Sequence, residues 1–281
     1  MNKVFVIIKE GLGNQIFQLA YGLWQVGGDP KRIVLDTSYY HKHCRHGGYA
    51  LRTLFGSAKF TGAEVDGLQN INLGRNIQFH SRKLPDGYFE ELQSLIGKAN
   101  IVADGWFQNY SYVAPNIKLL REFYEASASE LAPEDADFFT SNTVVGLHFR
   151  LNDYLKPNIQ YLYGIVNFDA MFQEMRSVVN NIRSDKPVRI AAFSDSPING
   201  PFDRIYVRKA ASALLDDIYS MHLMSLCDHL ICSNSTFSLW AGYLSRKLKT
   251  ISLPSPWTRS GIISTTNLLP PNGNIFPSGL S

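Results

Sequence analysis

A histidine and an arginine lie close to the end of an apolar segment in the second half of the chain. The segment Thr143–Phe149 is predicted to be a buried strand. Because strand side chains alternate between faces, His148 and Arg150 should point the same way at its carboxyl end. An arginine there can hold a phosphate with paired hydrogen bonds, and Asp153 is near enough to fix its rotamer. The alternative is a structural salt bridge at the end of a strand.

A run of small polar residues separates a second apolar segment, His229–Cys232, from a predicted helix, Ser235–Leu248. The run consists of Ser233, Asn234, Ser235 and Thr236. Ser, Asn and Thr cap helices, and the free N–H groups at a helix start bind anions. Because a cap needs one such residue, the run indicates that some of these side chains face a ligand. Simple capping is the alternative.

Asp195 follows a third predicted strand, Val188–Phe193. A carboxylate at the end of a strand in the same sheet can accept hydrogen bonds from a nucleobase or a ribose. An aspartate that forms the turn before Pro197 is the alternative for this residue.

Two glycines lie between the first predicted strand and the helix that follows it. Gly11 and Gly13 begin a dinucleotide-binding pattern, but Ile16 occupies the position of its third glycine. The lysine of a phosphate-binding P-loop is also missing. We interpret the segment as a turn that lets the backbone, Asn14 and Gln15 approach a ligand closely.

An aromatic loop contains candidate residues for binding a sugar. It includes Trp106, Phe107 and Gln108. Aromatic rings can stack on a sugar, and anchoring of the loop in the core is the alternative.

Metal ligands are poorly supported, because Asp135 and Asp137 fall in a stretch that reads as a solvated helix face. The remaining candidates, which fit no standard zinc spacing, are His41, His43, Cys44 and His46.

The composition is that of a globular protein. Of the 281 residues 45% are hydrophobic and 18% are charged, which disfavours disorder. A net charge of +3 without a Lys/Arg run argues against nucleic acid, but it suits an anionic small substrate or an acidic membrane surface. The chain has three cysteines, which lie outside metal-binding spacings, and it has no membrane-spanning stretch. Both features predict a cytoplasmic protein.

Strands and helices alternate in two stretches of the chain, which predicts an α/β fold. The predicted strands are Val4–Ile8, Ile33–Leu35, Thr143–Phe149, Val188–Phe193, His229–Cys232 and Thr250–Leu253. The predicted helices are Ile16–Val26, Val113–Phe123, Pro133–Phe139, Phe168–Asn181, Ala213–Cys227 and Ser235–Leu248. We expect two α/β domains, residues 1–140 and 141–281, that face each other across a cleft.

Taken together, these segments resemble the bacterial α-1,2-fucosyltransferase family, glycosyltransferase family 11. The segments that match, in the order the family has them, are Gly11–Ala20, Trp106–Gln108, His148–Tyr154 and Asn234–Trp240. The resemblance departs in three places. Leu151 replaces a second arginine and Asn152 a glycine, Glu10 replaces a glycine, and Leu239 replaces a tryptophan.

The resemblance implies a GT-B-like fold of two Rossmann-like domains, with acceptor binding in the first and GDP-fucose binding in the second. It implies an inverting, metal-independent transfer of L-fucose to the 2-hydroxyl of a galactoside, in the assembly of a bacterial surface polysaccharide such as O-antigen. Arg150 would hold the donor phosphates with Ser235 or Thr236, and His148 and Asp195 would lie by the guanosine. Asp153 is the first candidate for the base.

Further expectations about the site and its partners also follow from the resemblance. The donor site would include Gly11, Gly13, Asn14, Gln15, Ser233 and Asn234, and the acceptor site Trp106, Phe107 and Gln108. The partners would be GDP-fucose and a galactose-containing oligosaccharide, lipid-linked in some settings, with peripheral contact to the inner membrane. The alternatives are a transferase of the same fold that uses another nucleotide sugar, and a non-catalytic glycan-binding protein. A NAD-dependent oxidoreductase is a more distant alternative.

Overall fold

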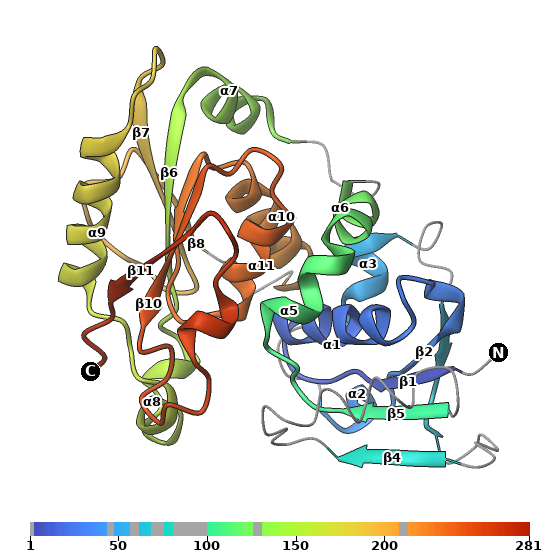
Figure 1. Ribbon diagram of the computed structural model, residues 1–281. Coiled ribbons are helices and arrows are strands. Elements are labelled where there is room, and N and C mark those ends of the chain that lie inside the picture. The colour runs from blue at the N-terminus through green and yellow to red at the C-terminus, as the bar shows by residue number, and fades with distance from the viewer. Residues whose placement is uncertain are drawn as a thin grey trace. The chain divides into compact units, whose positions relative to one another are not determined.

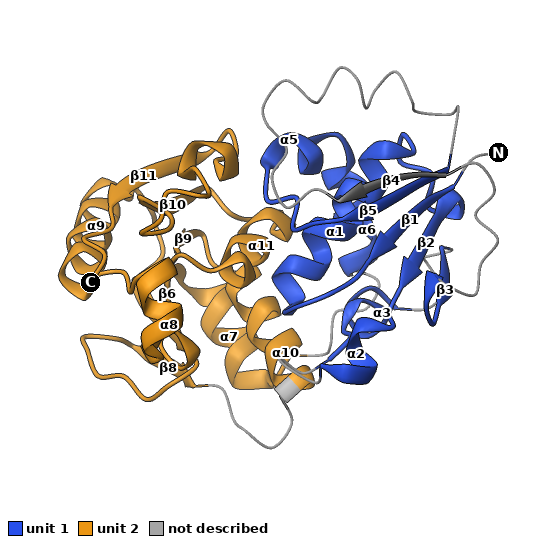
Figure 2. Cartoon of the chain, turned by 90° about the horizontal axis from the view of Figure 1, so that it is seen from below, with its two compact units in different colours: residues 1–128 blue, residues 129–281 orange. Residues whose placement is uncertain are grey.

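The computed structural model divides the chain into two compact units, residues 1–128 and 129–281 (Figure 2). It describes residues 3–43, 48–56, 62–68, 76–80, 100–125, 131–207 and 213–281. Two of the weak metal-ligand candidates, Cys44 and His46, lie outside these ranges. Each unit is an α/β layer built on its own parallel sheet, as the alternation of strands and helices predicted (Figure 1).

The sheet of the first unit runs in the order β3-β2-β1-β5-β4, and every described pair of neighbours is parallel. Its strands are β1 (Val4–Ile7), β2 (Ile33–Asp36), β3 (Ala63–Val65), β4 (Asn76–His80) and β5 (Asn100–Asp104). The helices are α1 (Leu12–Gln25), α2 (Tyr39–Lys42), α3 (Leu51–Phe55), α5 (Tyr110–Val113) and α6 (Ile117–Glu125), with short 3-10 turns at Pro30–Arg32 and Ala114–Asn116.

Helix α1 packs closely on strand β1. The predicted apolar face of the helix is fully buried; it comprises Ile16, Leu19, Ala20 and Leu23. A Cβ atom at Gly22 would lie 2.8 Å from Cγ2 of Val6, so only glycine permits this approach. The helix begins at Leu12, four residues before the predicted Ile16. Gly11, in extended backbone, is its N-cap residue.

The sheet of the second unit runs in the order β11-β10-β9-β6-β7-β8 and is also parallel. Its strands are β6 (Thr143–Phe149), β7 (Val188–Ser194), β8 (Arg204–Val207), β9 (His229–Ile231), β10 (Thr250–Ser255) and β11 (Gly273–Pro277). The helices are α7 (Pro133–Ser141), α8 (Pro157–Tyr163), α9 (Phe168–Asn181), α10 (Ala213–Ser225) and α11 (Thr236–Leu244), with 3-10 turns at Asp153–Leu155 and Thr265–Leu268.

Strand β6 is buried along its whole length and forms the centre of this unit. One face contributes Val145, Leu147 and Phe149 to a core that α9 covers with Met171 and Met175. The mostly apolar sequence of β6 is typical of a parallel strand covered on both faces.

The boundary between the units differs from the predicted one at residue 140, because α7 belongs to the second unit. Asp135 of α7 is 6% exposed and accepts hydrogen bonds from Tyr206 and Tyr219 at 2.6 Å, and it pairs with Arg204. The prediction of a solvated helix face was therefore wrong for Asp135. It holds for Asp137, which is exposed.

Helix α11 ends at Leu244 rather than at the predicted Leu248. The side chain of Ser245 accepts hydrogen bonds from the N–H groups of Lys247 and Leu248, at 3.2 and 3.0 Å. These bonds turn the chain toward β10 instead of continuing the helix. Within the described ranges, no helix has the length and apolarity needed to cross a bilayer.

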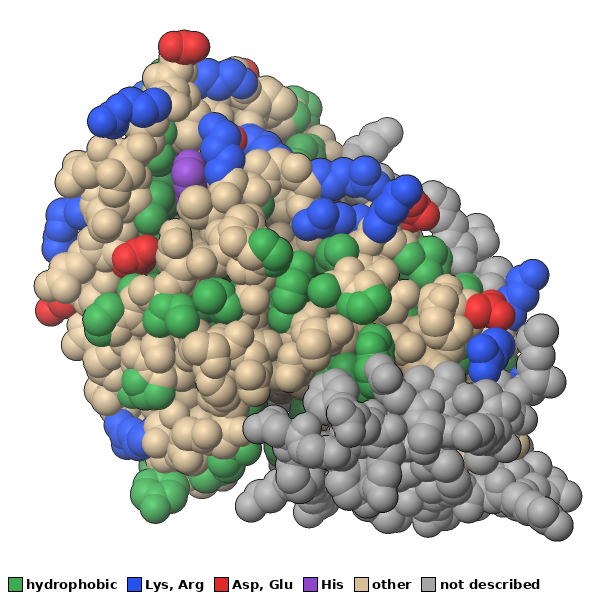
Figure 3. Space-filling model, in the orientation of Figure 1, with side chains coloured by type: hydrophobic (Ala, Val, Ile, Leu, Met, Phe, Trp, Pro, Cys, Tyr) green, Lys and Arg blue, Asp and Glu red, His purple; other side chains and the backbone are tan. Residues whose placement is uncertain are grey.

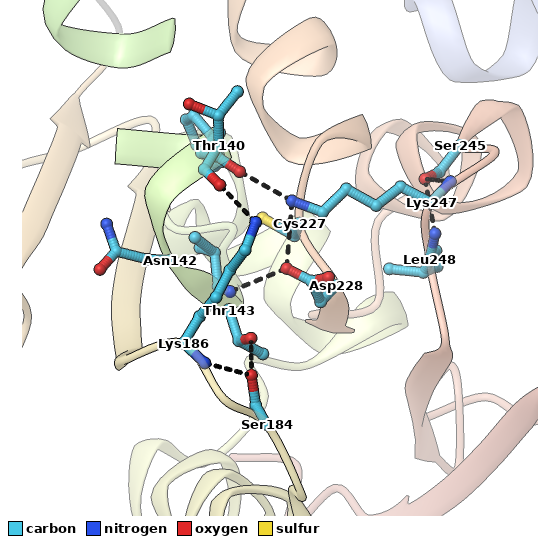
Figure 4. A network of polar contacts seen from close by, with 12 residues as sticks. Thr140, Asn142, Thr143, Ser184, Lys186, Cys227, Asp228, Ser245, Lys247 and Leu248 are labelled. Carbon is cyan, nitrogen blue, oxygen red and sulfur yellow. Dashed lines mark hydrogen bonds and ion pairs between the residues drawn. The ribbon is translucent and has the colours of Figure 1, made fainter. Parts of the chain in front are cut away.

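The amino end of β6 is fixed by a polar network around Asp228 (Figure 4). Asp228 Oδ2 accepts a hydrogen bond from the Val144 N–H at 2.9 Å and lies 3.1 Å from Lys247 Nζ. The Lys247 ammonium also donates to the Phe139 carbonyl at 2.8 Å. One buried carboxylate thus joins β6, the loop before β9 and the chain after α11.

Candidate active site

Three adjacent strands of the second unit bring the main candidate residues to one edge of the sheet. Strands β9, β6 and β7 are parallel neighbours, so their carboxyl ends meet at the same edge. Ser233 follows β9, Arg150 follows β6 and Asp195 follows β7. Ligands of open parallel sheets bind at this edge.

Two carboxylates hold the guanidinium of Arg150. Its Nη2 lies 2.7 Å from Asp153 Oδ1 and its Nη1 lies 3.0 Å from Asp195 Oδ2. Burial alone would lower the pKa of Arg150, but the two carboxylates outweigh it and raise that pKa, so the side chain stays charged. A guanidinium carries about five N–H groups. The two ion pairs leave others for a ligand, and 19% of the side chain is exposed.

Asp195 is committed to the protein on both of its carboxylate oxygens. Its Oδ1 accepts hydrogen bonds from the N–H groups of Leu151 and Asn152, at 2.9 and 3.2 Å, while Oδ2 faces Arg150. Its side chain is only 5% exposed. This geometry supports a role in orienting Arg150 and the turn after β6 more strongly than the expected contact with a nucleobase.

His148 is buried and neutral. Its Nδ1 lies 2.8 Å from Ser233 Oγ, and its ring is 6.0 Å from that of Phe237. Burial, and secondly the charge of Arg150, lower the pKa of His148 from 6.5 to about 3. The side chain therefore joins β6 to the polar run after β9 as an uncharged hydrogen-bonding group.

This buried imidazole predicts that acid destabilises the protein. The unfolded histidine takes up a proton below about pH 6.5, whereas the folded one stays neutral down to about pH 3. The stabilisation is thus present above the unfolded pKa and is lost as the pH falls. Between about pH 7.5 and about pH 5 we expect a loss of about 2 kcal/mol in the free energy of unfolding.

Urea unfolding at both pH values measures this effect. His148→Gln should remove about 2 kcal/mol of the pH dependence, while the exposed His41→Gln should leave it in place. Equal pH dependence in His148→Gln and the unsubstituted protein would contradict the assignment.

The start of α11 combines free main-chain donors with buried polar side chains. Ser235 is the N-cap, with extended backbone and no side-chain cap bond. Asn234 is 2% exposed and donates to the carbonyls of Tyr163 and Gly164 at 3.0 and 3.2 Å. Thr236, half-buried, is the first residue of the helix. First-turn N–H groups of a helix can bind an anion.

Tyr154 connects the arginine to this helix start, although no separate role was predicted for it. Its hydroxyl donates to the Asn234 carbonyl at 3.0 Å, and the Arg150 guanidinium carbon lies 5.7 Å from the centre of its ring. Burial raises the pKa of Tyr154, so the hydroxyl keeps its proton. The position of Tyr154 directly after Asp153 was the available signal.

Two departures from the family pattern lie in the core rather than at the site. Leu239 is fully buried within α11, and the side chain of Leu151 packs against the core around Phe149. The Leu151 main chain still donates to Asp195.

The candidates of the first unit lie at the carboxyl ends of β1 and β5. Gln108 Nε2 donates to Asn14 Oδ1 at 2.7 Å, which joins the aromatic loop to the first turn of α1. Trp106 is 40% exposed. Phe107 instead stacks on Tyr21, with ring centres 3.7 Å apart, so it anchors the loop in the core.

The glycine turn positions this part of the unit. Gln15 is fully buried; it donates to the carbonyls of Glu10 and Gly48 and accepts from the Ala50 N–H. It therefore acts as a structural connector. Gly11 and Gly13 form the N-cap and first turn of α1.

This architecture defines the class of protein. It is GT-B-like, the fold of solved fucosyltransferases. The α-1,6-fucosyltransferase NodZ crystallised with GDP matches at a TM-score of 0.53 and 17% identity, over 87% of this chain and 92% of that one. The Bradyrhizobium NodZ structure matches at 0.53 and 16%, with the same coverage. NodZ soaked with GDP-fucose matches at 0.50 and 14%, again with that coverage.

The chain belongs to glycosyl transferase family 11, whose family model matches residues 68–260. The family predicted from the sequence is thereby confirmed. An α-1,2-colitosyltransferase from Escherichia coli is 23% identical over 275 residues, which cover 92% of this chain and 93% of the relative.

Proposed function

We propose that the chain transfers L-fucose from GDP-fucose to the 2-hydroxyl of a galactoside, with inversion at the anomeric carbon and without a metal ion. The observation that carries the proposal is the position of the Arg150 guanidinium. Asp153 and Asp195 hold it at the edge of the sheet where α11 begins. The fold shared with NodZ, which was crystallised with GDP and soaked with GDP-fucose, supports the donor. The α-1,2 linkage named for the Escherichia coli relative supports the 2-hydroxyl.

The reaction requires charge stabilisation at the leaving group. As the bond from the anomeric carbon to the phosphate oxygen breaks, negative charge builds on the diphosphate of GDP. Arg150 and the first-turn N–H groups of α11 are preorganised donors that stabilise this charge. The acceptor oxygen attacks from the opposite face of the sugar, and as the new glycosidic bond forms its proton passes to solvent water.

Asp153 serves this scheme as an orienting residue rather than as the base. Its Oδ1 lies 2.7 Å from Arg150 Nη2, so the carboxylate is already engaged with the guanidinium. Asp153→Asn keeps an oxygen for the guanidinium, so we expect kcat to fall less than about 10-fold; loss of a base typically costs about 10²- to 10⁴-fold. Steady-state kinetics with saturating donor and acceptor measure the difference. A loss above about 100-fold, with unchanged GDP affinity, would identify Asp153 as the base instead.

Transfer of colitose is a second candidate, because the Escherichia coli relative is named for it. Colitose is L-fucose without its 3-hydroxyl, so the two donors present the same diphosphate and differ in one group of the sugar. A site that hydrogen-bonds the 3-hydroxyl discriminates strongly against the donor that lacks it.

A screen of donors and acceptors tests the proposal. GDP-fucose, GDP-colitose and UDP-galactose are each offered with β-galactosides, and the linkage of any product is read by NMR. We expect a fucosyl-α-1,2-galactose product whose formation continues in EDTA. A product from GDP-colitose alone would favour the second candidate, and activity that EDTA abolishes and Mn²⁺ restores would overturn metal independence.

A further inference from the structure

We propose that an exposed apolar surface on the second unit docks the protein onto an anionic lipid bilayer. We call it the α8 surface: it consists of Leu155, Tyr161, Leu162 and Ile262, with Lys156 and Arg259 beside them. This inference does not rest on the proposed function, since vesicle binding is measured without donor or acceptor.

The α8 surface concentrates apolar side chains that the fold leaves in solvent. Tyr161 is 74% exposed, Ile262 63%, Leu155 59% and Leu162 42%. Of nine large apolar side chains found exposed among the described residues, four therefore belong to this surface. Figure 3 shows hydrophobic side chains projecting at the lower end of the second unit, where α8 lies in Figure 1.

The α8 surface is held together by the main chain. The N–H groups of Arg259 and Ser260 donate to the carbonyls of Tyr163 and Leu162, each at 3.3 Å. The loop that carries Ile262 is thereby fixed against the end of α8. Asn234 holds the same helix end through Tyr163 and Gly164. These main-chain bonds hold the end of α8, which carries Tyr161 and Leu162, against the loop that carries Ile262.

The charged residues around these side chains favour an anionic bilayer as the partner of the α8 surface. Neither Leu155–Tyr163 nor Pro256–Ile263 contains an aspartate or a glutamate, whereas each contains one basic residue, Lys156 or Arg259, and both are exposed. Apolar side chains, a tyrosine and basic residues together fit the interface of an anionic bilayer. A second copy of the chain would place like charges against each other in a symmetric contact, which disfavours it.

The α8 surface lies close in sequence to the candidate active site. Leu155 belongs to the same short 3-10 turn as Asp153, which pairs with Arg150. A bilayer on this surface therefore lies beside the candidate active site, where an acceptor carried on a lipid would be presented.

Sedimentation with vesicles tests the proposal. The protein should bind vesicles of phosphatidylcholine with phosphatidylglycerol at least about 10-fold more strongly than phosphatidylcholine alone, and less strongly at high salt. Leu155→Ser should weaken that binding about 10-fold. Leu215→Ser is the matched control, since Leu215 on α10 is 65% exposed, and it should bind like the unsubstituted protein. Lys156→Gln should weaken binding several-fold and Lys249→Gln should not.

Three results would overturn the proposal. They are no binding to anionic vesicles by the unsubstituted protein, equal binding by Leu155→Ser and Leu215→Ser, and a dimer in light scattering that Leu155→Ser dissociates. Circular dichroism and a thermal melt establish that each variant folds. Tyr161→Ser, which alters the most exposed member of the surface, replaces Leu155→Ser if the latter does not fold.

Discussion

Replacing Arg150 with alanine should lower kcat at least about 100-fold, or about 2.7 kcal/mol of transition-state stabilisation. The guanidinium is the charged donor at the edge of the sheet where β6, β7 and β9 end, and two carboxylates fix its orientation. In the proposed mechanism, its loss leaves the first-turn N–H groups of α11 to stabilise the leaving group. Initial rates with saturating GDP-fucose measure kcat, and calorimetry with GDP measures the accompanying loss of affinity.

The control must separate catalysis from folding. Arg150→Ala leaves Asp153 and Asp195 without their cation, and a buried charge that loses its partner destabilises a fold. Combining it with Asp153→Asn and Asp195→Asn removes that charge and keeps acceptors for the turn after β6. Arg189→Ala, at a half-exposed arginine of β7, should keep near-normal turnover. A folded Arg150→Ala variant within about threefold of normal kcat would refute the role of Arg150.

The positions of these residues could be predicted because strand geometry is local. An apolar run that ends in His148 and Arg150 fixes both side chains on one face, and the structure has that strand over the predicted residues. Of the two ion pairs of Arg150, the one with Asp153 could be predicted from the sequence and the one with Asp195 could not. Asp153 is close in sequence, whereas the contact with Asp195 depends on β6 and β7 being neighbours in the sheet.

Two other features were missed, one because it depends on contacts distant in sequence and the other because a local side-chain hydrogen bond overrides the apolar pattern. The buried Asp135 looked like part of a solvated helix until Tyr206 and Tyr219, far along the chain, supplied its partners. Helix α11 ends early because a single serine side chain caps the turn, whereas the apolar pattern continues to Leu248. Hydrophobic periodicity predicts which elements form more reliably than where they end.

The polar network at the other end of β6 should govern stability rather than turnover. Asp228→Ala removes the acceptor of the buried Val144 N–H and a partner of Lys247, and we expect the free energy of unfolding to fall by about 3 kcal/mol. Asp228→Asn keeps an oxygen for Val144 and should lose less than half as much. Urea unfolding followed by circular dichroism measures both changes.

The same variants test whether the two ends of β6 are functionally separate. Val144 and Arg150 are about 20 Å apart along the strand at about 3.3 Å per residue, so the ion pairs of Arg150 should survive the loss of Asp228. At a temperature where Asp228→Ala is folded, its kcat should stay within about twofold of normal. Asp137→Ala, at an exposed aspartate of α7, should change stability by less than about 0.5 kcal/mol. A stable Asp228→Ala variant with sharply reduced kcat would show instead that strain at the amino end of β6 reaches the guanidinium.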